Sequence, residues 1–297
     1  MFNISTNGKA RQICRAFLLC LLLVLPGACS SYLLFDPADS ARKEVRNAGW
    51  TEEFFPFKPF GLIGFRPQSI AQAPILDVYI EGDGYAWRNL TTPSPDPTPL
   101  DPVALHMAIA DRNNAVLYLA RPCQYQRSGA RDGCDVAYWT NRRFAPEVVD
   151  SLNNAINKHV GRIGAKRLRI IGYSGGGVLA ALVAAKRSDI EFLVTVAAPI
   201  DHAAWTTHHD VSPLRGSLNP TDFAASLGSI RQIHLLGEDD KITPRSVLEA
   251  YRKRLPLNAP IEIRTIKKFS HTCCWADRWA ELFGDIISSS QIGMTKH

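Results

Sequence analysis

The sequence lacks several features that mark common classes of protein. It has no Cys-x-x-Cys pair, whereas structural zinc sites usually need four well-spaced cysteine or histidine ligands. It has no cluster of lysines and arginines with interleaved aromatic residues, so the electrostatic footprint of a nucleic-acid-binding protein is missing. No internal repeat is evident. These absences argue against a zinc-stabilised protein and against a nucleic-acid partner.

What is present is the composition of a globular protein. Of 297 residues, 46% are hydrophobic and 21% are charged, so the chain can bury a sizeable core and wholesale disorder is excluded. The length fits one or two domains, since single α/β domains often reach about 200 to 250 residues.

The N-terminus has the pattern of an export signal. Three positive charges and no acidic residue precede an apolar run from Ala16 to Leu25. Such a run is too short to cross a bilayer as a helix, which needs about 20 residues. The sequence therefore predicts a signal peptide over residues 1–28, and its removal lowers the formal charge from +6 to +3.

The end of this signal, Leu25-Pro26-Gly27-Ala28-Cys29, resembles the lipobox of bacterial lipoproteins. In that family, small residues precede a cysteine that is acylated and becomes the new N-terminus. Pro26 departs from the family pattern, which has an aliphatic residue there. The resemblance implies a lipid anchor at Cys29 and a place in the cell envelope, and Ser30 is compatible with sorting to an outer membrane facing the periplasm. The alternative is an ordinary signal cleaved near Ala28.

Cysteine usage agrees with export. Two cysteines leave with the signal peptide and Cys29 is the candidate anchor, so four remain, an even number that suggests disulfides in an oxidising compartment. Cys123 and Cys134 bracket a polar segment, and we predict a disulfide that closes a surface loop there. Adjacent cysteines rarely pair with each other, so we expect Cys273 and Cys274 to be unpaired and buried.

From about residue 75, short apolar runs alternate with longer helical patterns, which indicates a parallel sheet covered by helices. The expected strands are 75–80, 115–119, 168–171, 191–197, 230–236 and 261–266, and the expected helices are 101–111, 144–160, 175–186, 245–254 and 275–288. Residues 91–102 hold five prolines and have the composition of a linker, but the strand before them needs neighbours, so we expect a loop over one end of the sheet. Residues 29–70 either wrap the outside of the domain or begin an antiparallel edge.

One motif carries chemistry. Gly172-Tyr173-Ser174-Gly175-Gly176 fits Gly-x-Ser-x-Gly, a pattern expected by chance in about one chain of this length in ten. Here it directly follows a predicted strand and opens a predicted helix, which is the context of a nucleophile elbow. The glycines leave room for a tight turn that exposes the serine. The alternative is that Ser174 only caps the helix.

With this motif the chain resembles the α/β-hydrolase family, which carries a catalytic triad in the order serine, acid, histidine. Asp240 stands in the register Gly-x-x-Asp after a strand, and His271 follows the last strand. The resemblance implies a three-layer α/β-hydrolase fold, with a mostly parallel central sheet and helices on both faces. It gives a domain over 71–290, with 200–229 as a short lid-like insertion.

The same resemblance implies a role for each residue. His271 would be the general base for Ser174, and Asp240 would orient its imidazole. The oxyanion hole would come from the backbone N–H groups of Gly175 and Asp83, although Glu81 stands where the family often has histidine. Asp201 competes with Asp240 because it follows the preceding strand. The competing histidines are His202, His208 and His209, and we expect structural or solvated roles for His106, His159 and His234.

The function implied is two-step acyl transfer to water through an acyl-serine intermediate, with no metal or organic cofactor. The substrate would be a small-molecule or lipid-like ester, thioester or amide, and the sequence does not distinguish these. Two alternatives are a catalytically inactive lipoprotein that keeps the scaffold for binding, and an acyltransferase that uses an alcohol in place of water.

Overall fold

A single mixed β-sheet forms the centre of the described protein. The computed structural model describes residues 36–69, 72–113, 115–126 and 133–294, with side chains up to residue 289. The predicted signal peptide and Cys29 lie outside these residues.

The strands are β1 (Trp50–Phe55), β2 (Leu62–Pro67), β3 (Ile75–Ile80), β4 (Val116–Leu119), β5 (Arg167–Tyr173), β6 (Ile190–Val196), β7 (Gln232–Gly237) and β8 (Ile261–Ile266). Their order is β1-β2-β4-β3-β5-β6-β7-β8. Strands β3 to β8 are mutually parallel, whereas β2 runs antiparallel to both β1 and β4.

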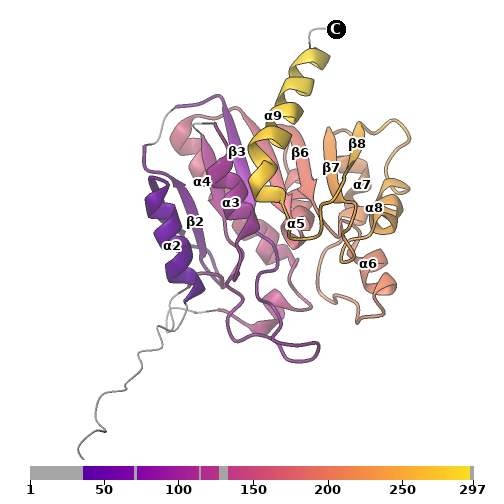
Figure 1. Ribbon diagram of the computed structural model, residues 1–297, viewed down its shortest axis with the longest axis horizontal. Coiled ribbons are helices and arrows are strands. Elements are labelled where there is room, and N and C mark those ends of the chain that lie inside the picture. The colour runs from indigo at the N-terminus through magenta and orange to yellow at the C-terminus, as the bar shows by residue number, and fades with distance from the viewer. Residues whose placement is uncertain (1–35, 70–71, 114, 127–132, 295–297) are drawn as a thin grey trace, which may run out of the picture. The chain divides into compact units, whose positions relative to one another are not determined.

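Helices cover both faces of the sheet (Figure 1). One face carries α2 (Pro37–Asn47), α3 (Val103–Ala110) and α9 (Trp275–Met294), whose buried side chains share a core with Tyr79, Tyr118 and Ile171. The other face carries α4 (Pro146–Ile163), α5 (Gly175–Ala184), α7 (Ala224–Leu227) and α8 (Arg245–Arg252). The remaining short elements are α6 (His202–His208) and two 3₁₀ helices, Val136–Trp139 and Pro220–Phe223. The expected layered α/β architecture is therefore present.

Local sequence explains why these elements form. The central strands β5, β6 and β7 are apolar along most of their length, as expected of parallel strands covered on both faces. Helix α4 begins with Pro146, whose missing N–H costs nothing at a helix start, and ends at Gly164, which adopts the left-handed conformation with φ 71°. Helix α5 is buried throughout because it packs directly beneath the sheet.

The N-terminal part of the described chain extends the sheet. Of the two possibilities for this region, the structure has the antiparallel edge, because β1 and β2 pair with each other and β2 pairs with β4. Helix α2 was not expected from the sequence. It buries only Ala38, Ala41 and Val45, which recur at helical spacing but are few and lie in a mostly polar segment.

The proline-rich residues 91–102 are a loop that packs onto the protein, as predicted. The indole N–H of Trp139 donates to the carbonyl of Ser94 (3.0 Å), and the hydroxyl of Thr98 accepts from the N–H of Tyr125 (2.8 Å). A linker between domains would lack such contacts. No helix in the described part of the chain is long and apolar enough to cross a membrane.

The structure confirms one of the two predictions made for the cysteines and contradicts the other. Cys123 and Cys134 form the predicted disulfide, with their Cα atoms 5.7 Å apart. The expectation that Cys273 and Cys274 are unpaired and buried is wrong. Their sulfur atoms are bonded to each other, and Cys273 is exposed because both residues lie in a turn in which the N–H of Ser270 donates to the carbonyl of Cys273 (3.0 Å).

Two buried histidines make the fold sensitive to acid. Burial lowers the pKa of His159 from 6.5 to about 4 and that of His234 from 6.5 to about 3. Between pH 6.5 and these values the unfolded chain binds protons that the folded chain does not, so the free energy of unfolding decreases as the pH falls. We expect His159→Gln to reduce the loss between pH 7 and pH 5 by about 2 kcal/mol in urea unfolding. An unchanged pH dependence would contradict this assignment.

Candidate active site

Ser174 lies on a sharp turn between β5 and α5. Its backbone has φ 50° and ψ −125°, a strained combination for a residue with a side chain, which costs about 1–3 kcal/mol. The Ser174 N–H donates to the carbonyl of Val196 (2.8 Å), and its carbonyl accepts from the N–H of Gly177 (2.9 Å). The serine makes no side-chain cap bond to the helix that follows. The geometry is therefore that of a nucleophile elbow and not of a capping serine.

The glycines on either side of Ser174 are required by close backbone contacts. A Cβ on Gly172 would lie 2.2 Å from the carbonyl oxygen of Gly176. A Cβ on Gly176 would lie 2.2 Å from the carbonyl oxygen of Ile80. Both distances are far below van der Waals contact, so neither position tolerates a larger residue without movement of the backbone.

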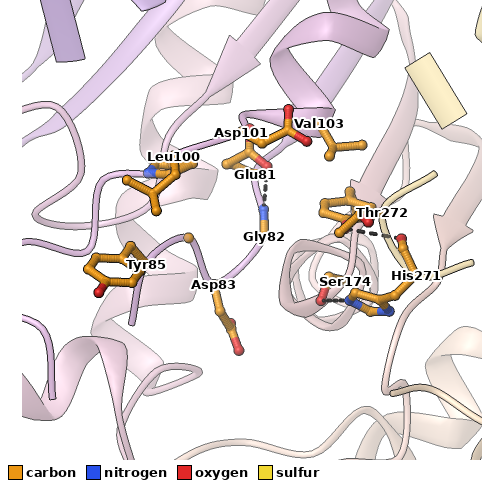
Figure 2. A pocket seen from close by; sticks show the side chains of 13 residues that line it. Glu81, Gly82, Asp83, Tyr85, Leu100, Asp101, Val103, Ser174, His271 and Thr272 are labelled. Atoms are coloured by element: carbon orange, nitrogen blue, oxygen red, sulfur yellow. Dashed lines mark hydrogen bonds between the residues drawn. The ribbon is translucent and has the colours of Figure 1, made fainter. Parts of the chain in front are cut away.

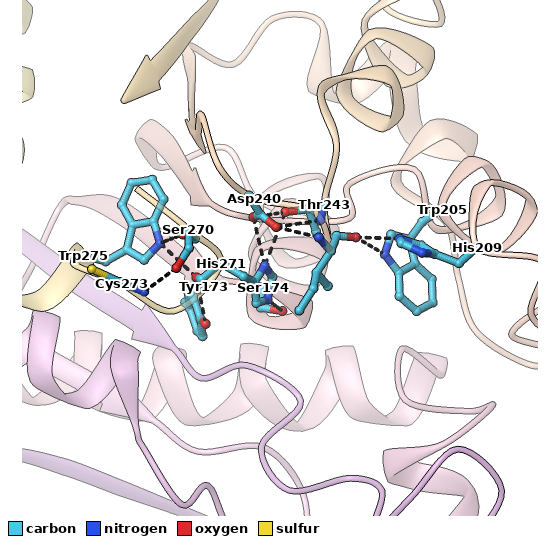
Figure 3. A network of polar contacts seen from close by, with 11 residues as sticks. Tyr173, Ser174, Trp205, His209, Asp240, Thr243, Ser270, His271, Cys273 and Trp275 are labelled. Carbon is cyan, nitrogen blue, oxygen red and sulfur yellow. Dashed lines mark hydrogen bonds and ion pairs between the residues drawn. The ribbon is translucent and has the colours of Figure 1, made fainter. Parts of the chain in front are cut away.

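His271 lies on the loop between β8 and α9, and its imidazole reaches Ser174. The distance from His271 Nε2 to Ser174 Oγ is 3.0 Å. The hydroxyl of Tyr173 and the indole N–H of Trp275 both donate to the backbone carbonyl of His271, at 3.1 and 3.0 Å. These two donors fix the backbone that carries the imidazole (Figure 3).

Asp240, on the loop after β7, completes a chain of hydrogen bonds. Its Oδ2 lies 2.9 Å from His271 Nδ1 and also accepts from the hydroxyl of Thr243. Its Oδ1 accepts from the N–H groups of Ile242 and Thr243, at 2.8 and 2.9 Å. A carboxylate cannot donate, so Nδ1 carries the imidazole proton and Nε2 is left to accept from Ser174.

The charge of Asp240 is stabilised at this position. Its side chain is fully buried, and burial by itself raises its pKa. The hydrogen bond and charge of His271 and the donors of Thr243 outweigh burial, so the net effect lowers the pKa of Asp240. The aspartate is thus a buried anion beside the imidazole, as orientation of a general base requires.

The competing residues have other partners. Asp201 caps α6 by accepting from the N–H groups of Ala203 and Ala204 (3.2 and 3.1 Å), and it also accepts from the side-chain amide of Asn219 (2.9 Å). His202 lies 3.1 Å from the carbonyl of Leu218. The other histidines also bond elsewhere or lie at the surface: His209 contacts the carbonyl of Ile242, His106 contacts Glu44, His234 contacts Thr195, and His208 is exposed. None of them replaces His271 beside Ser174.

Two backbone N–H groups near Ser174 are free to bind an oxyanion. Within the described residues, neither the N–H of Gly175 nor that of Asp83 donates to an acceptor. The N–H of Gly82 is not available, because it donates to the carboxylate of Glu81 (2.8 Å). A Cβ on Gly175 would lie 2.0 Å from Asp83 Oδ1, so these two residues are close neighbours.

Glu81, which stands where histidine was expected from the family resemblance, holds the loop that carries Asp83. It is almost fully buried, and besides Gly82 it accepts from the hydroxyl of Tyr118 (3.0 Å) and weakly from the N–H groups of Ala104 and Leu105 at the start of α3. Burial outweighs these donors and raises the pKa of Glu81. The side chain therefore connects the loop, strand β4 and helix α3.

The carboxylate of Asp83 is held by two arginines. It forms ion pairs with Arg121, which follows β4, and with Arg143, which precedes α4. Both guanidinium groups are buried. Burial by itself raises the pKa of Asp83, but the charges of Arg143 and Arg121 dominate and lower it to about 2. Two cations therefore share the carboxylate of Asp83 beside the candidate oxyanion hole, and Arg121 also feels the charge of Glu81, so the charge of Asp83 is compensated there.

A cavity of about 300 Å³ opens beside Ser174 (Figure 2). Its wall combines apolar side chains, including Tyr85, Leu100 and Val103, with Ser174 and His271. Residues 200–229 contribute nothing to this wall among the described residues. Instead, the indole N–H of Trp205 donates to the carbonyl of Ile242 (2.7 Å), which ties α6 to the loop that carries Asp240.

Sequence reasoning missed three supporting positions. Thr243 lies three residues after Asp240, a spacing typical of a turn in which an aspartate accepts from the following backbone, and this signal was available. Arg121 and Arg143 gave no signal, because they are distant in sequence and meet only at Asp83.

No group of three or more metal-ligating side chains occurs among the described residues.

Comparison with known proteins rests on structure. No protein-family model matches the chain, and no curated protein matches it in sequence. The fold is similar to that of an esterase from Pyrococcus furiosus, with 14% identity and a TM-score of 0.56 over 82% of this chain and 91% of that one. It is also similar to a serine hydrolase homologue from Coxiella burnetii, with 15% identity and a TM-score of 0.54 over 80% and 96% of the two chains.

A third similar structure is a membrane phospholipase A described as a bacterial virulence factor. It is 16% identical, with a TM-score of 0.55 over 95% of this chain and all of that one. Identities this low show a shared fold. The chain therefore has the three-layer α/β-hydrolase fold.

Proposed function

We propose that the protein is a serine hydrolase that cleaves a carboxylic ester through an acyl-Ser174 intermediate. The observation that carries the proposal is the continuous chain of hydrogen bonds from Ser174 Oγ to His271 Nε2 (3.0 Å) and from His271 Nδ1 to Asp240 Oδ2 (2.9 Å). These three residues come from separate loops at the same edge of the sheet. A purely structural role would not require a strained serine in that position.

The reaction has two steps. Ser174 Oγ attacks the carbonyl carbon of the substrate while its proton passes to His271 Nε2. Collapse of the tetrahedral intermediate breaks the ester bond, and His271 returns the proton to the leaving alcohol. A water molecule then repeats the sequence on the acyl-enzyme, which releases the carboxylic acid and restores Ser174. Asp240 stabilises the imidazolium that forms in each step.

The negative charge on the substrate oxygen is stabilised by three groups. The N–H groups of Gly175 and Asp83 are the candidate donors, and the N-terminus of α5 adds a favourable partial charge. The carboxylate of Asp83 would oppose the oxyanion, but Arg121 and Arg143 neutralise it. The site would therefore keep a favourable electrostatic potential despite an aspartate next to the oxyanion hole.

An ester is the proposed substrate, with thioesters and amides open to the same chemistry. The cavity volume of about 300 Å³ lies at the lower end of the range for small-molecule sites, and its wall has apolar side chains suited to an acyl group. We further propose that the protein is exported and attached to the cell envelope through a lipid on Cys29.

A fluorophosphonate probe tests the proposed function, because it reacts with an activated serine in place of an ester. We expect stoichiometric labelling of the full chain, detected by mass spectrometry at Ser174, and no labelling of Ser174→Ala. Ser151→Ala is the control, since Ser151 lies on α4, away from the site, and is buried, whereas Ser174 is half-buried. A correctly folded protein that never labels would support the inactive scaffold instead.

A further inference from the structure

The loop after β3 carries a short hairpin, residues 86–94, next to the active-site cavity. Trp87 and Pro93 form an antiparallel bridge, and the N–H of Arg88 donates to the carbonyl of Thr92 (2.9 Å). The side chain of Asn89 accepts from the N–H groups of Thr91 and Thr92, at 3.0 and 2.9 Å. This turn presents Leu90 at the apex with its side chain 100% exposed.

Hydrogen bonds and a small buried cluster fix the base of the hairpin, so the hairpin is an ordered element that presents its exposed side chains in a defined position. The N–H of Ser94 donates to the carbonyl of Ala86 (2.9 Å), and Trp139 donates to the carbonyl of Ser94. Ala86 and Trp139 pack with Cys123 in a small buried cluster, and Cys134 joins them through the disulfide. The disulfide therefore supports the base of the hairpin.

Exposed apolar residues run from this hairpin to the mouth of the cavity. Trp87 is 39% exposed on the hairpin, and Tyr85 and Leu100, which line the cavity, are 36% and 54% exposed. We call Tyr85, Trp87, Leu90 and Leu100 the apolar rim. Arg88, which follows Trp87 on the hairpin, is exposed.

The described chain begins at the same edge of the sheet. Strand β1 runs in the same direction as β3 and β4, because β2 is antiparallel to both β1 and β4. Helix α2 returns to β1 through a two-residue turn and so starts at the edge where the parallel strands end. Figure 1 shows the start of α2 and the loop after β3 at the same, lower edge.

This placement indicates which surface would meet a bilayer. From Cys29 to Pro37 the chain advances eight residues, which span at most about 28 Å when fully extended. A lipid on Cys29 would therefore keep the active-site edge close to the membrane. Tryptophan and arginine are also the side chains that favour the headgroup region, and a leucine at an apex gains most from entering the acyl region.

We propose that the apolar rim docks on a phospholipid bilayer, with Leu90 inserted, so that the cavity takes amphiphilic acyl esters directly from the membrane. The inference rests on the proposed hydrolase function for its substrate class. The docking itself rests on the rim and on the position of α2. Trp87 and Arg88 would lie at the headgroup level, and Tyr85 and Leu100 would guide the acyl chain towards Ser174.

The first test measures the full chain in phosphatidylcholine vesicles. We expect Leu90→Asp to lower the hydrolysis rate of a long-chain ester embedded in the bilayer by about tenfold. Hydrolysis of a soluble short-chain p-nitrophenyl ester should change by less than about twofold, because Leu90 does not line the cavity. Leu90→Trp should retain both activities. An equal loss on both substrates, or no loss on either, would overturn the proposal.

The matched control is Leu257→Asp. Leu257 is as exposed as Leu90 but lies between α8 and β8, at the opposite edge of the sheet, so neither rate should change. If Leu90→Asp instead dissociates a dimer in sedimentation analysis and leaves the lipid rate intact, the rim is a self-association surface and the proposal is wrong.

A second test does not depend on catalysis. The Cys29→Ala chain cannot be acylated, and we expect it still to float with phosphatidylcholine vesicles. Addition of Leu90→Asp should weaken this binding by about tenfold. Equal flotation with and without Leu90→Asp would reject bilayer docking even if the protein is an active hydrolase, so failure of the docking and failure of the hydrolase proposal are distinguishable.

Discussion

We expect His271→Ala to lower kcat for a p-nitrophenyl ester by about 10⁴- to 10⁶-fold, with little change in KM. The imidazole is the only base within hydrogen-bonding distance of Ser174 Oγ among the described residues, and triad members act as a unit. Ser174→Ala and the double variant should therefore have the same residual rate as His271→Ala. Steady-state kinetics of the three variants give the measurement.

Asp240→Asn tests whether Asp240, and not Asp201, is the acid that orients His271. The asparagine keeps the size of the side chain and the bonds from the backbone of Thr243, but it would favour the wrong tautomer of His271, so we expect kcat to fall by about 10⁴-fold. Asp201→Asn is the matched control and should change kcat little. A large effect at Asp201 with a small one at Asp240 would reverse the assignment of the acid.

We expect Asp83→Ala to lower the free energy of unfolding by about 3–5 kcal/mol, because it leaves the buried Arg121 and Arg143 without their shared anion. It should also lower kcat by about 100-fold, since the loop that carries the Asp83 N–H loses its two fixed contacts. Urea unfolding and ester kinetics measure the two effects separately. An unchanged kcat in a destabilised protein would show that the carboxylate of Asp83 does not position the N–H of that residue for catalysis.

The matched control for Asp83 is an exposed ion pair. Asp150 pairs with Lys186, and both side chains are 44% exposed, so Asp150→Ala should lower the free energy of unfolding by less than about 1 kcal/mol.

The pH dependence of the free energy of unfolding gives a further test of the ion pairs of Asp83. The pKa of Asp83 is lowered from 3.8 to about 2, so its contribution to stability is complete above about pH 4 and is lost as the pH falls towards 2.

The compensation of Asp83 by two buried arginines is a second feature of this site, beside the hydrogen bonds of Ser174, His271 and Asp240. An aspartate in the oxyanion loop would disfavour the reaction unless it were neutralised, and here the neutralising groups come from two separate segments, after β4 and before α4. We expect substitutions at Arg121 or Arg143 to affect kcat more than KM, because the oxyanion exists only in the transition state and the intermediate.

Much of the fold followed from local pattern. The strands 75–80 and 261–266 have the predicted bounds. The first is mostly apolar and the second alternates apolar and polar residues, and both patterns are typical of strands. Helix α2 was missed although its three buried residues recur at helical spacing, because they are few and lie in a mostly polar segment. The vicinal disulfide was also missed, because the conformation of a turn cannot be inferred from the identity of its two cysteines.

The sequence by itself determined the elbow at Ser174, because strand, glycines and helix are adjacent in the chain and their steric requirements are local. The resemblance to the α/β-hydrolase family also indicated His271 and Asp240, because they follow Ser174 in the order and register that this family has. Only the tertiary structure placed Asp240 and not Asp201 beside His271, brought Arg121 and Arg143 to Asp83, and brought Leu100 to the cavity that Ser174 lines. These contacts join segments far apart in sequence, so their distances depend on the packing of the whole domain.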